Sequence, residues 1–125
     1  MKLFDSCVWA EILAESEAGK TYKQRLPAAR QLLVPTLVLY EVSKWASRTM
    51  SSQKVDEVLV TLLTCQVVES TVAIAVYAAE LATKYKLHAL NALIYATALE
   101  HDAELVTCDA HFKDLPQVAY AAKSS

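Results

Sequence analysis

The sequence predicts an α/β fold, a three-layer α/β/α sandwich with a central parallel sheet of about five strands. Short apolar runs alternate along the chain with longer segments in which apolar residues recur at helical spacing. This alternation is typical of a parallel sheet, since each crossover helix returns the chain to the same end of the sheet. The length of 125 residues fits a single domain over residues 1–125 and leaves no room for two.

The first expected strand covers residues 3–4 and stops at Asp5. Ser6 is then expected to cap a helix, because its hydroxyl can accept from the free backbone amides of the first turn. Residues 15–25 are polar and predict a second helix, and residues 31–34 are an apolar run that predicts the second strand.

Thr36 is expected to open the next helix, and Ser51 or Ser52 another one, whose apolar residues follow the spacing of an amphipathic helix. A third strand is expected over residues 66–68. Residues 71–85 predict a long helix with apolar residues on more than one face, so we expect it to be well buried.

The last helix is expected to begin at Asn91, a good N-cap residue, and to end near residue 100. Residues 104–108 predict a fourth strand that stops at Asp109. A fifth strand over residues 118–120 is expected at the edge of the sheet, because Pro116 lies just before it.

Composition excludes several classes of protein. Gly19 is the only glycine, so a glycine-rich phosphate loop is impossible. The three cysteines have no close spacing, which excludes a zinc site of paired thiolates and argues against a disulfide framework. An acid at position 5 argues against a signal peptide, and no apolar run approaches the ~20 residues of a membrane span. We therefore expect a cytoplasmic protein without membrane contact.

Four oxygen-bearing side chains are expected at the carboxyl edge of the sheet. Asp5 and Asp109 each follow a strand directly, Glu41 lies in the first turns of the helix after the second strand, and Asn91 starts the helix before the fourth. Ligands of open parallel sheets bind at this edge. Clustered carboxylates repel one another unless a cation neutralises them, and a site with oxygen ligands alone suits Mg²⁺ or Mn²⁺. Such an ion activates water for attack on a phosphodiester.

Each of these residues also has a purely structural interpretation. Asp5 can assist capping of its helix, Asp109 can make an Asx-turn, and Asn91 can be an N-cap without further role. Glu41 can be a solvated surface carboxylate. Taken together, however, the four predict a metal-dependent phosphodiesterase whose acidic residues converge on one surface pocket.

At these residues the chain resembles the PIN-domain family, and within it the VapC-type toxins of bacterial toxin–antitoxin pairs. The matching stretches, in chain order, are Phe4-Asp5-Ser6, Val34-Pro35-Thr36 leading to Glu41, residues 91–98, and Thr107-Cys108-Asp109 followed by His111-Phe112. They cover nearly the whole chain. The resemblance implies a PIN-like sandwich, a Mg²⁺ or Mn²⁺ site, endonucleolytic RNA cleavage, a homodimer, and inhibition by a small VapB-like antitoxin.

Carried over by position, the resemblance assigns Asp5, Glu41 and Asp109 to the metal site, with Ser6 and Thr107 as supporting hydroxyls. Asn91 completes the catalytic set but departs from the family, which usually has Asp there. Asparagine keeps the shape and one carbonyl oxygen but loses the charge, so this chain is expected to be impaired. Whether Asn91 is natural or an inactivating substitution stays open, as does the number of metal ions.

RNA binding needs a local basic patch, since the net charge is −2 and strong nucleic-acid binders carry a basic excess. Lys44 and Arg48 lie on the side of Glu41, three and seven residues further along its helix, and are candidate RNA contacts; a solvated charged stripe is the alternative. Further candidates are Lys20, Lys23 and Arg25.

Two alternative functions are considered. A non-enzymatic PIN-like domain that binds a protein partner or RNA without cleavage is favoured by Asn91. A phospho-accepting receiver domain also uses acids at strand ends, but it requires an adjacent acidic pair after the first strand, which Asp5-Ser6 does not supply.

Overall fold

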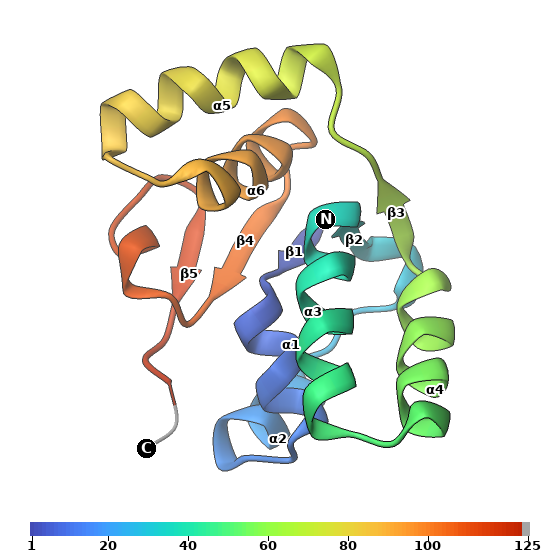
Figure 1. Ribbon diagram of the computed structural model, residues 1–125. Helices are drawn as coiled ribbons and strands as arrows, with labels where there is room; N and C mark the ends of the chain where they lie inside the picture. The colour runs from blue at the N-terminus through green and yellow to red at the C-terminus, as the bar shows by residue number, and fades with distance from the viewer. Residues whose placement is uncertain (124–125) are drawn as a thin grey trace.

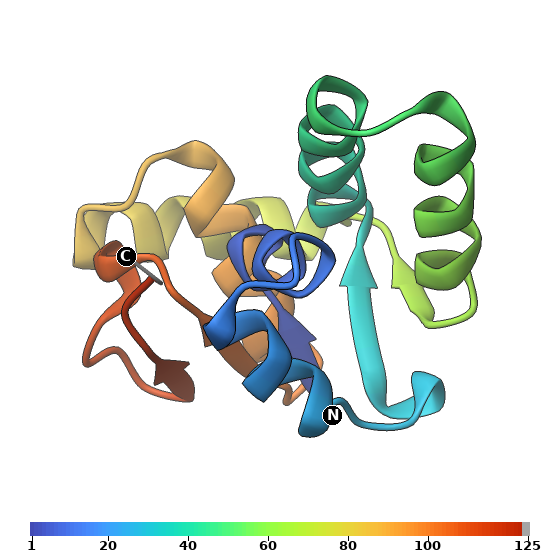
Figure 2. The same ribbon diagram turned by 90° about the horizontal axis from the view of Figure 1, so that it is seen from below.

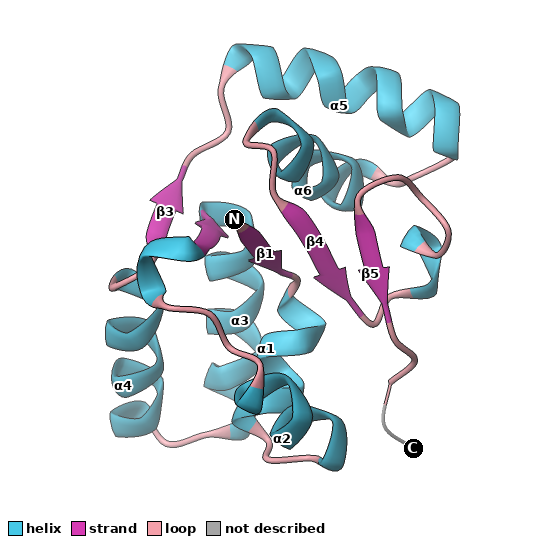
Figure 3. Ribbon diagram, turned by 180° about the vertical axis from the view of Figure 1, so that it is seen from behind, coloured by secondary structure: helices cyan, strands magenta, loops and turns pink. Residues whose placement is uncertain are grey.

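The structure is a computed structural model that describes residues 1–123. Its centre is a five-stranded sheet of order β3-β2-β1-β4-β5 in which every neighbouring pair is parallel. The strands are β1 (Lys2–Phe4), β2 (Leu32–Pro35), β3 (Gln66–Val68), β4 (Glu104–Thr107) and β5 (Val118–Tyr120). The prediction of five parallel strands, with the last one at an edge, is therefore confirmed; β1, β4 and β5 lie side by side in Figure 3.

Helices pack on both sides of this sheet (Figure 1). They are α1 (Ser6–Leu13), α2 (Glu17–Gln24), α3 (Thr36–Thr49), α4 (Ser52–Leu63), α5 (Val72–Tyr85) and α6 (Ala89–Glu100), with short 3-10 turns η1 (Ala29–Gln31) and η2 (Ala110–Phe112). The chain steps from β1 to β3 in one direction and returns to β4 in the other. Right-handed crossovers therefore place α1 to α4 on one side and α5 and α6 on the opposite side, as the predicted sandwich requires. Figure 2 shows the pair of α3 and α4 standing beside α1.

The core is formed by the inner strands and the helix faces that cover them. Leu3, Val34 and Leu105 from three neighbouring strands are completely buried. Strands buried on both faces consist of nearly continuous apolar runs, which is why the sequence locates them well. Within residues 1–123, no helix is long and apolar enough to cross a membrane.

The strand order creates a switch point between β1 and β4. Connections from β1 lead to one side of the sheet and the connection into β4 comes from the other. In open sheets of this kind, the ligand-binding crevice lies beyond the carboxyl ends of the two strands at the switch point. Asp5 follows β1 and Asp109 follows shortly after β4. The fold thus places both acids at the crevice.

Three helix starts differ from the prediction. The N-cap of α1 is Asp5, whose carboxylate accepts from the amide of Ser6, so Ser6 is the first helical residue instead of the cap. The second helix begins at Glu17 with Ser16 as its cap. The last helix begins at Ala89, so Asn91 lies inside the first turn and the expectation that it is the N-cap was wrong.

The expectation that the α5 helix is well buried was also wrong. Only Ile74, Ala78 and Leu81 are buried, whereas Val72 and Val76 are 83% and 58% exposed. The helix packs on α6, and its exposed valines are left largely uncovered by residues 1–123. Apolar content alone did not reveal which face lacks a partner.

Gly19 is required by the close approach of α2 to α1. A Cβ atom at this position would overlap the carbonyl oxygen of Glu11 and lie 2.8 Å from the amide nitrogen of Ile12. Both are backbone atoms, which cannot move aside as a flexible side chain would. The single glycine of the sequence is therefore explained by helix packing.

We expect Gly19→Ala to destabilise the protein by about 1–3 kcal/mol or more, the usual cost of overpacking, although alanine favours helix formation. Urea unfolding followed by circular dichroism measures the change. The control is Lys20→Ala on the exposed side of the same helix, expected to stay within about 0.5 kcal/mol of the parent. A Gly19→Ala protein as stable as the parent would show that α2 shifts away freely.

Candidate active site at the carboxyl edge of the sheet

Asp5 joins β1, α1 and β4 through one buried carboxylate. Its backbone N–H continues the pairing with β4 by donating to Val106 O at 2.9 Å. Its Oδ1 accepts from the Ser6 amide at 2.8 Å, and its Oδ2 accepts from Thr107 Oγ1 at 2.8 Å. The residue is only 4% exposed. The capping role is thus real, and the same carboxylate lies at the crevice.

Asp109 is held by donors on both sides. Its own N–H donates to Thr107 Oγ1 at 3.0 Å, so one threonine hydroxyl connects the two aspartates. The amide of His111 donates to Asp109 Oδ1 at 2.9 Å, which is the Asx-turn considered from the sequence, and Asn91 Nδ2 donates to Oδ2 at 3.2 Å. Asn91 is buried and therefore positions Asp109 instead of capping its helix.

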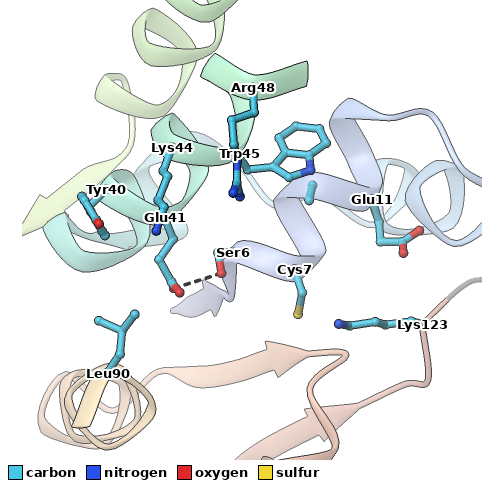
Figure 4. A pocket seen from close by; sticks show the side chains of 11 residues that line it. Ser6, Cys7, Glu11, Tyr40, Glu41, Lys44, Trp45, Arg48, Leu90 and Lys123 are labelled. Atoms are coloured by element: carbon cyan, nitrogen blue, oxygen red, sulfur yellow. Dashed lines mark hydrogen bonds between the residues drawn. The ribbon is translucent and has the colours of Figure 1, made fainter. Parts of the chain in front are cut away.

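Glu41 reaches the same region from the second turn of α3. Ser6 Oγ donates to Glu41 Oε1 at 3.0 Å, the dashed line in Figure 4. Through Ser6, Asp5 and Thr107, hydrogen bonds join all six residues singled out by the sequence into one network. The structure therefore brings together the residues that sequence reasoning selected, and it shows which residue orients which.

The carboxylates differ in their electrostatic surroundings. Burial raises the pKa of Asp5 above its usual range, against the hydrogen bonds from Thr107 and Ser6, and the nearby charge of Asp109 adds to the increase. Burial also raises the pKa of Glu41, against the hydrogen bond from Ser6. For Asp109, burial is again the largest single influence and acts upward, but the donors on His111 and Asn91 together outweigh it and lower its pKa.

The donor chemistry fits a hard divalent cation. Asp5 and Glu41 form no ion pair with any of residues 1–123, so their partly buried negative charge has no neutralising side chain among these residues. Within the same residues, no three His, Cys, Asp or Glu side chains lie close enough together to hold one ion. Mg²⁺ nevertheless keeps several waters and needs only one or two protein carboxylates. Asp5 and Asp109, joined by Thr107, are the pair that suits this requirement.

A cavity with a volume of about 590 Å³ lies beside this network. Glu41 and Ser6 line it, but Asp5 and Asp109 do not. Of the three acids expected to share one surface pocket, only Glu41 therefore lines this cavity. Lys44 and Arg48 line it as the sequence suggested. The other basic candidates, Lys20, Lys23 and Arg25, lie on or next to α2 and do not line it.

Sequence reasoning missed several neighbours of the site. His111 Nδ1 lies 2.8 Å from Asp109 Oδ1, and His88 Nε2 lies 3.2 Å from Asn91 Nδ2. Both histidines are exposed, yet both contact site residues. Their spacing was the available signal: two residues after Asp109, and three residues before Asn91 on the same helical turn. Lys123, which also lines the cavity, gave no signal because it arrives from the end of the chain.

Comparisons with known proteins agree with this architecture. The PIN domain family model matches residues 2–118. The fold is similar to that of a toxin–antitoxin complex from Klebsiella pneumoniae, with a TM-score of 0.84 and 24% identity over 95% of this chain and 96% of that chain. It also resembles VapBC2 from Rickettsia felis bound to a promoter DNA fragment, with a TM-score of 0.75 and 16% identity over 98% of both chains.

A third similar structure is VapC20 of Mycobacterium tuberculosis, described as a toxin that cleaves the sarcin–ricin loop, with a TM-score of 0.68 and 13% identity over 83% of this chain and 85% of that chain. At these identities the likeness shows the fold. No curated protein matches the sequence.

The burial of Asp5 predicts that its ionised carboxylate lowers the stability of the metal-free protein as pH rises, and that a bound metal ion raises the stability. Because its folded pKa is raised, its contribution to stability is complete below the unfolded pKa of about 4 and is lost as pH rises through the folded pKa. Asp5→Asn removes this penalty and keeps an oxygen for the Ser6 amide. We expect Asp5→Asn to unfold at a higher temperature than the parent at pH 7 without metal, with the difference shrinking toward pH 4.

Thermal unfolding with and without Mg²⁺ completes the measurement. Mg²⁺ should raise the Tm of the parent but not of Asp5→Asn, since an ion that binds only the folded state stabilises it by mass action. The matched control is Asp56→Asn, an exposed acid of α4, which should respond like the parent. If Mg²⁺ shifted the Tm of the parent and of Asp5→Asn equally, Asp5 would not belong to the metal site.

Proposed function

Because the chain belongs to the PIN-domain family, we propose that it is a metal-dependent endoribonuclease and the toxin of a VapBC-type toxin–antitoxin pair. The observation that carries this proposal is the acidic network at the switch point, where Asp5 is buried with neutral hydrogen-bond partners and without an ion pair to any basic side chain of residues 1–123. A buried charge without a counter-ion is costly, so the arrangement favours a protein that binds a cation there. The description of VapC20 as an RNA-cleaving toxin of the same fold supports the substrate class.

Mg²⁺ or Mn²⁺ is the proposed cofactor, held by Asp5 and Asp109 with Glu41 nearby. Such an ion would polarise a phosphoryl oxygen and lower the pKa of bound water. Thr107 keeps Asp5 and Asp109 in register by donating to one and accepting from the other. Ser6 fixes the Glu41 carboxylate at 3.0 Å.

Glu41 is the residue best suited to take a proton from the attacking water. Among the described residues, it is the only one of the three acids that lines the cavity. Its pKa is raised toward neutral pH, where a general base is most effective. Lys44 and Arg48 line the same cavity and would attract the phosphate backbone of RNA.

In this proposal, Asn91 lowers the metal affinity and the catalytic activity of the chain. Its amide donates to Asp109, whereas an aspartate would place a second carboxylate against Asp109. The additional charge would strengthen the binding of a hard cation. The second candidate function, a non-enzymatic domain that binds RNA or a protein partner, is favoured by this same amide, because it already satisfies Asp109 without metal.

The proposed partners are RNA, a VapB-like antitoxin and a second copy of the chain. The similar structures from Klebsiella pneumoniae and Rickettsia felis are toxin–antitoxin complexes. A homodimer is supported by the exposed apolar face of α5, where Val72 and Val76 lie one turn apart.

We expect Asn91→Asp to raise Mg²⁺- and Mn²⁺-dependent cleavage of a mixed RNA pool by at least about tenfold, the lower end of the change commonly seen when a residue hydrogen-bonded to a metal ligand is replaced. Without metal, the variant should be less stable than the parent by about 1–3 kcal/mol, because a donor to Asp109 is replaced by a like charge. If Asn91 were an N-cap, only a small effect on folding would be expected, because Asn and Asp are similar N-caps.

The control is Asn91→Ala, which removes the amide without adding charge. It should lose stability without gaining activity. Equal cleavage rates for the parent and the Asn91→Asp variant would show that residue 91 only positions Asp109. Metal-independent RNA binding without cleavage in both proteins would favour the non-enzymatic function.

For the proposed homodimer, light scattering at increasing concentration should give twice the monomer mass of 13.8 kDa. The double substitution Val72→Glu and Val76→Glu should shift the protein to monomer, because two charges would enter the apolar face of α5. Val60→Glu, which charges an exposed valine on α4, is the matched control and should leave the dimer intact. A parent that is monomeric at all concentrations would contradict the proposal.

A further inference from the structure

The cavity beside Glu41 combines aromatic rings with cations. Tyr40 and Trp45 line it from α3, together with Lys44 and Arg48, and Lys123 lines it from the segment after β5. In Figure 4, Lys44 and Arg48 extend from α3 toward the space that holds Glu41, and Lys123 reaches this space from the opposite side. Two parts of the chain far apart in sequence thus supply positive charge to one hollow.

These three cations have no acidic partner. None of Lys44, Arg48 and Lys123 forms an ion pair with any of residues 1–123. The two acids of the cavity are already engaged, Glu41 by Ser6 and Glu11 by Ser16. In a protein of net charge −2, three cations without an ion-pair partner among residues 1–123 gather at one cavity, and this favours an anionic ligand.

The aromatic rings indicate what else this ligand carries. Tyr40 is 59% exposed, an unusual exposure for a large ring, and Lys44 Nζ lies 5.9 Å from its centroid. Trp45 is partly buried and also lines the cavity. Nucleobases stack on such rings, and the stacking tolerates every base because each one has a π-face. A volume of about 590 Å³ lies within the range of ligand pockets.

We propose that this cavity is a subsite for an unpaired nucleotide of RNA, with its base stacked on Trp45 or Tyr40 and its flanking phosphates held by Lys44, Arg48 and Lys123. The inference rests on the proposed function, and it adds the aromatic rings and the cation from the segment after β5 that would hold one nucleotide beside the acidic network. A duplex does not expose its base faces to side chains, whereas loops and single strands do. Glu41 at the wall of the cavity places the subsite directly beside the acidic network.

The test measures binding without cleavage. A fluorescein-labelled, unstructured RNA hexamer and a labelled RNA duplex are titrated in EDTA, with fluorescence anisotropy as the readout. The hexamer should bind more tightly than the duplex. Trp45→Ala should raise the Kd of the hexamer about tenfold, the effect of losing one stacked base, whereas Trp45→Phe should stay within about threefold.

The cations are tested by salt dependence. Arg48→Gln and Lys123→Gln should each lower the slope of log Kd against log salt concentration by about 0.7, the value for one phosphate contact with a single strand. Lys84→Gln is the matched control, because Lys84 also lies over a tyrosine, Tyr85, but on α5 and outside the cavity. It should bind like the parent.

Equal affinity for hexamer and duplex, no RNA binding, or an unchanged Kd in Trp45→Ala would each overturn the subsite. The fate of the proposed function is measured separately, by metal-dependent cleavage with Asn91→Asp. If RNA is cleaved and Trp45→Ala leaves the KM unchanged, the ribonuclease function stands and the subsite is rejected. If binding depends on stacking but no RNA is cleaved, the subsite stands and the ribonuclease function is rejected.

Discussion

The carboxylate of Asp5 connects the fold to the chemistry of the site. It caps α1, and it ties β1 to β4 through Thr107 at the one place where the strand order reverses. Its partners there are neutral, so its negative charge is solvated by hydrogen bonds alone and the nearby Asp109 makes ionisation harder. The same burial that penalises the ionised residue in the metal-free protein is what would make a cation bind.

The network spreads from Asp5 to two sides with different character. Toward α6, Thr107, Asp109 and Asn91 form a set in which each polar side chain has a hydrogen-bond partner. Toward α3, Ser6 leads to Glu41 and then to a cavity with unpaired cations. The acidic side proposed to hold metal thus adjoins the basic side proposed to hold phosphate. This separation of charge would allow a chain of net charge −2 to bind RNA as proposed.

The sequence predicted the strands better than the helix ends. Buried parallel strands are continuous apolar runs bounded by polar residues, and this pattern is visible without a structure. N-caps are less visible because neighbouring polar residues compete for them: Asp5 and Ser6 are both good caps, and the backbone conformation selects Asp5. At the start of α6 the position of the turn selects His88, although its side chain makes no capping bond, and Asn91 is drawn to Asp109 instead.

The sequence by itself determined which acids reach the carboxyl edge, because strand ends and helical spacing fix the places of Asp5, Asp109 and Glu41. Helical spacing likewise placed Lys44 and Arg48 on the Glu41 side of their helix. Only the tertiary structure decided their partners. Thr107 bonds Asp5 across 102 residues and Ser6 bonds Glu41 across 35, and Lys123 joins the α3 cations from the far end of the chain. Such contacts depend on strand order and on the path of the crossovers, whereas hydrophobic periodicity describes only neighbours along the chain.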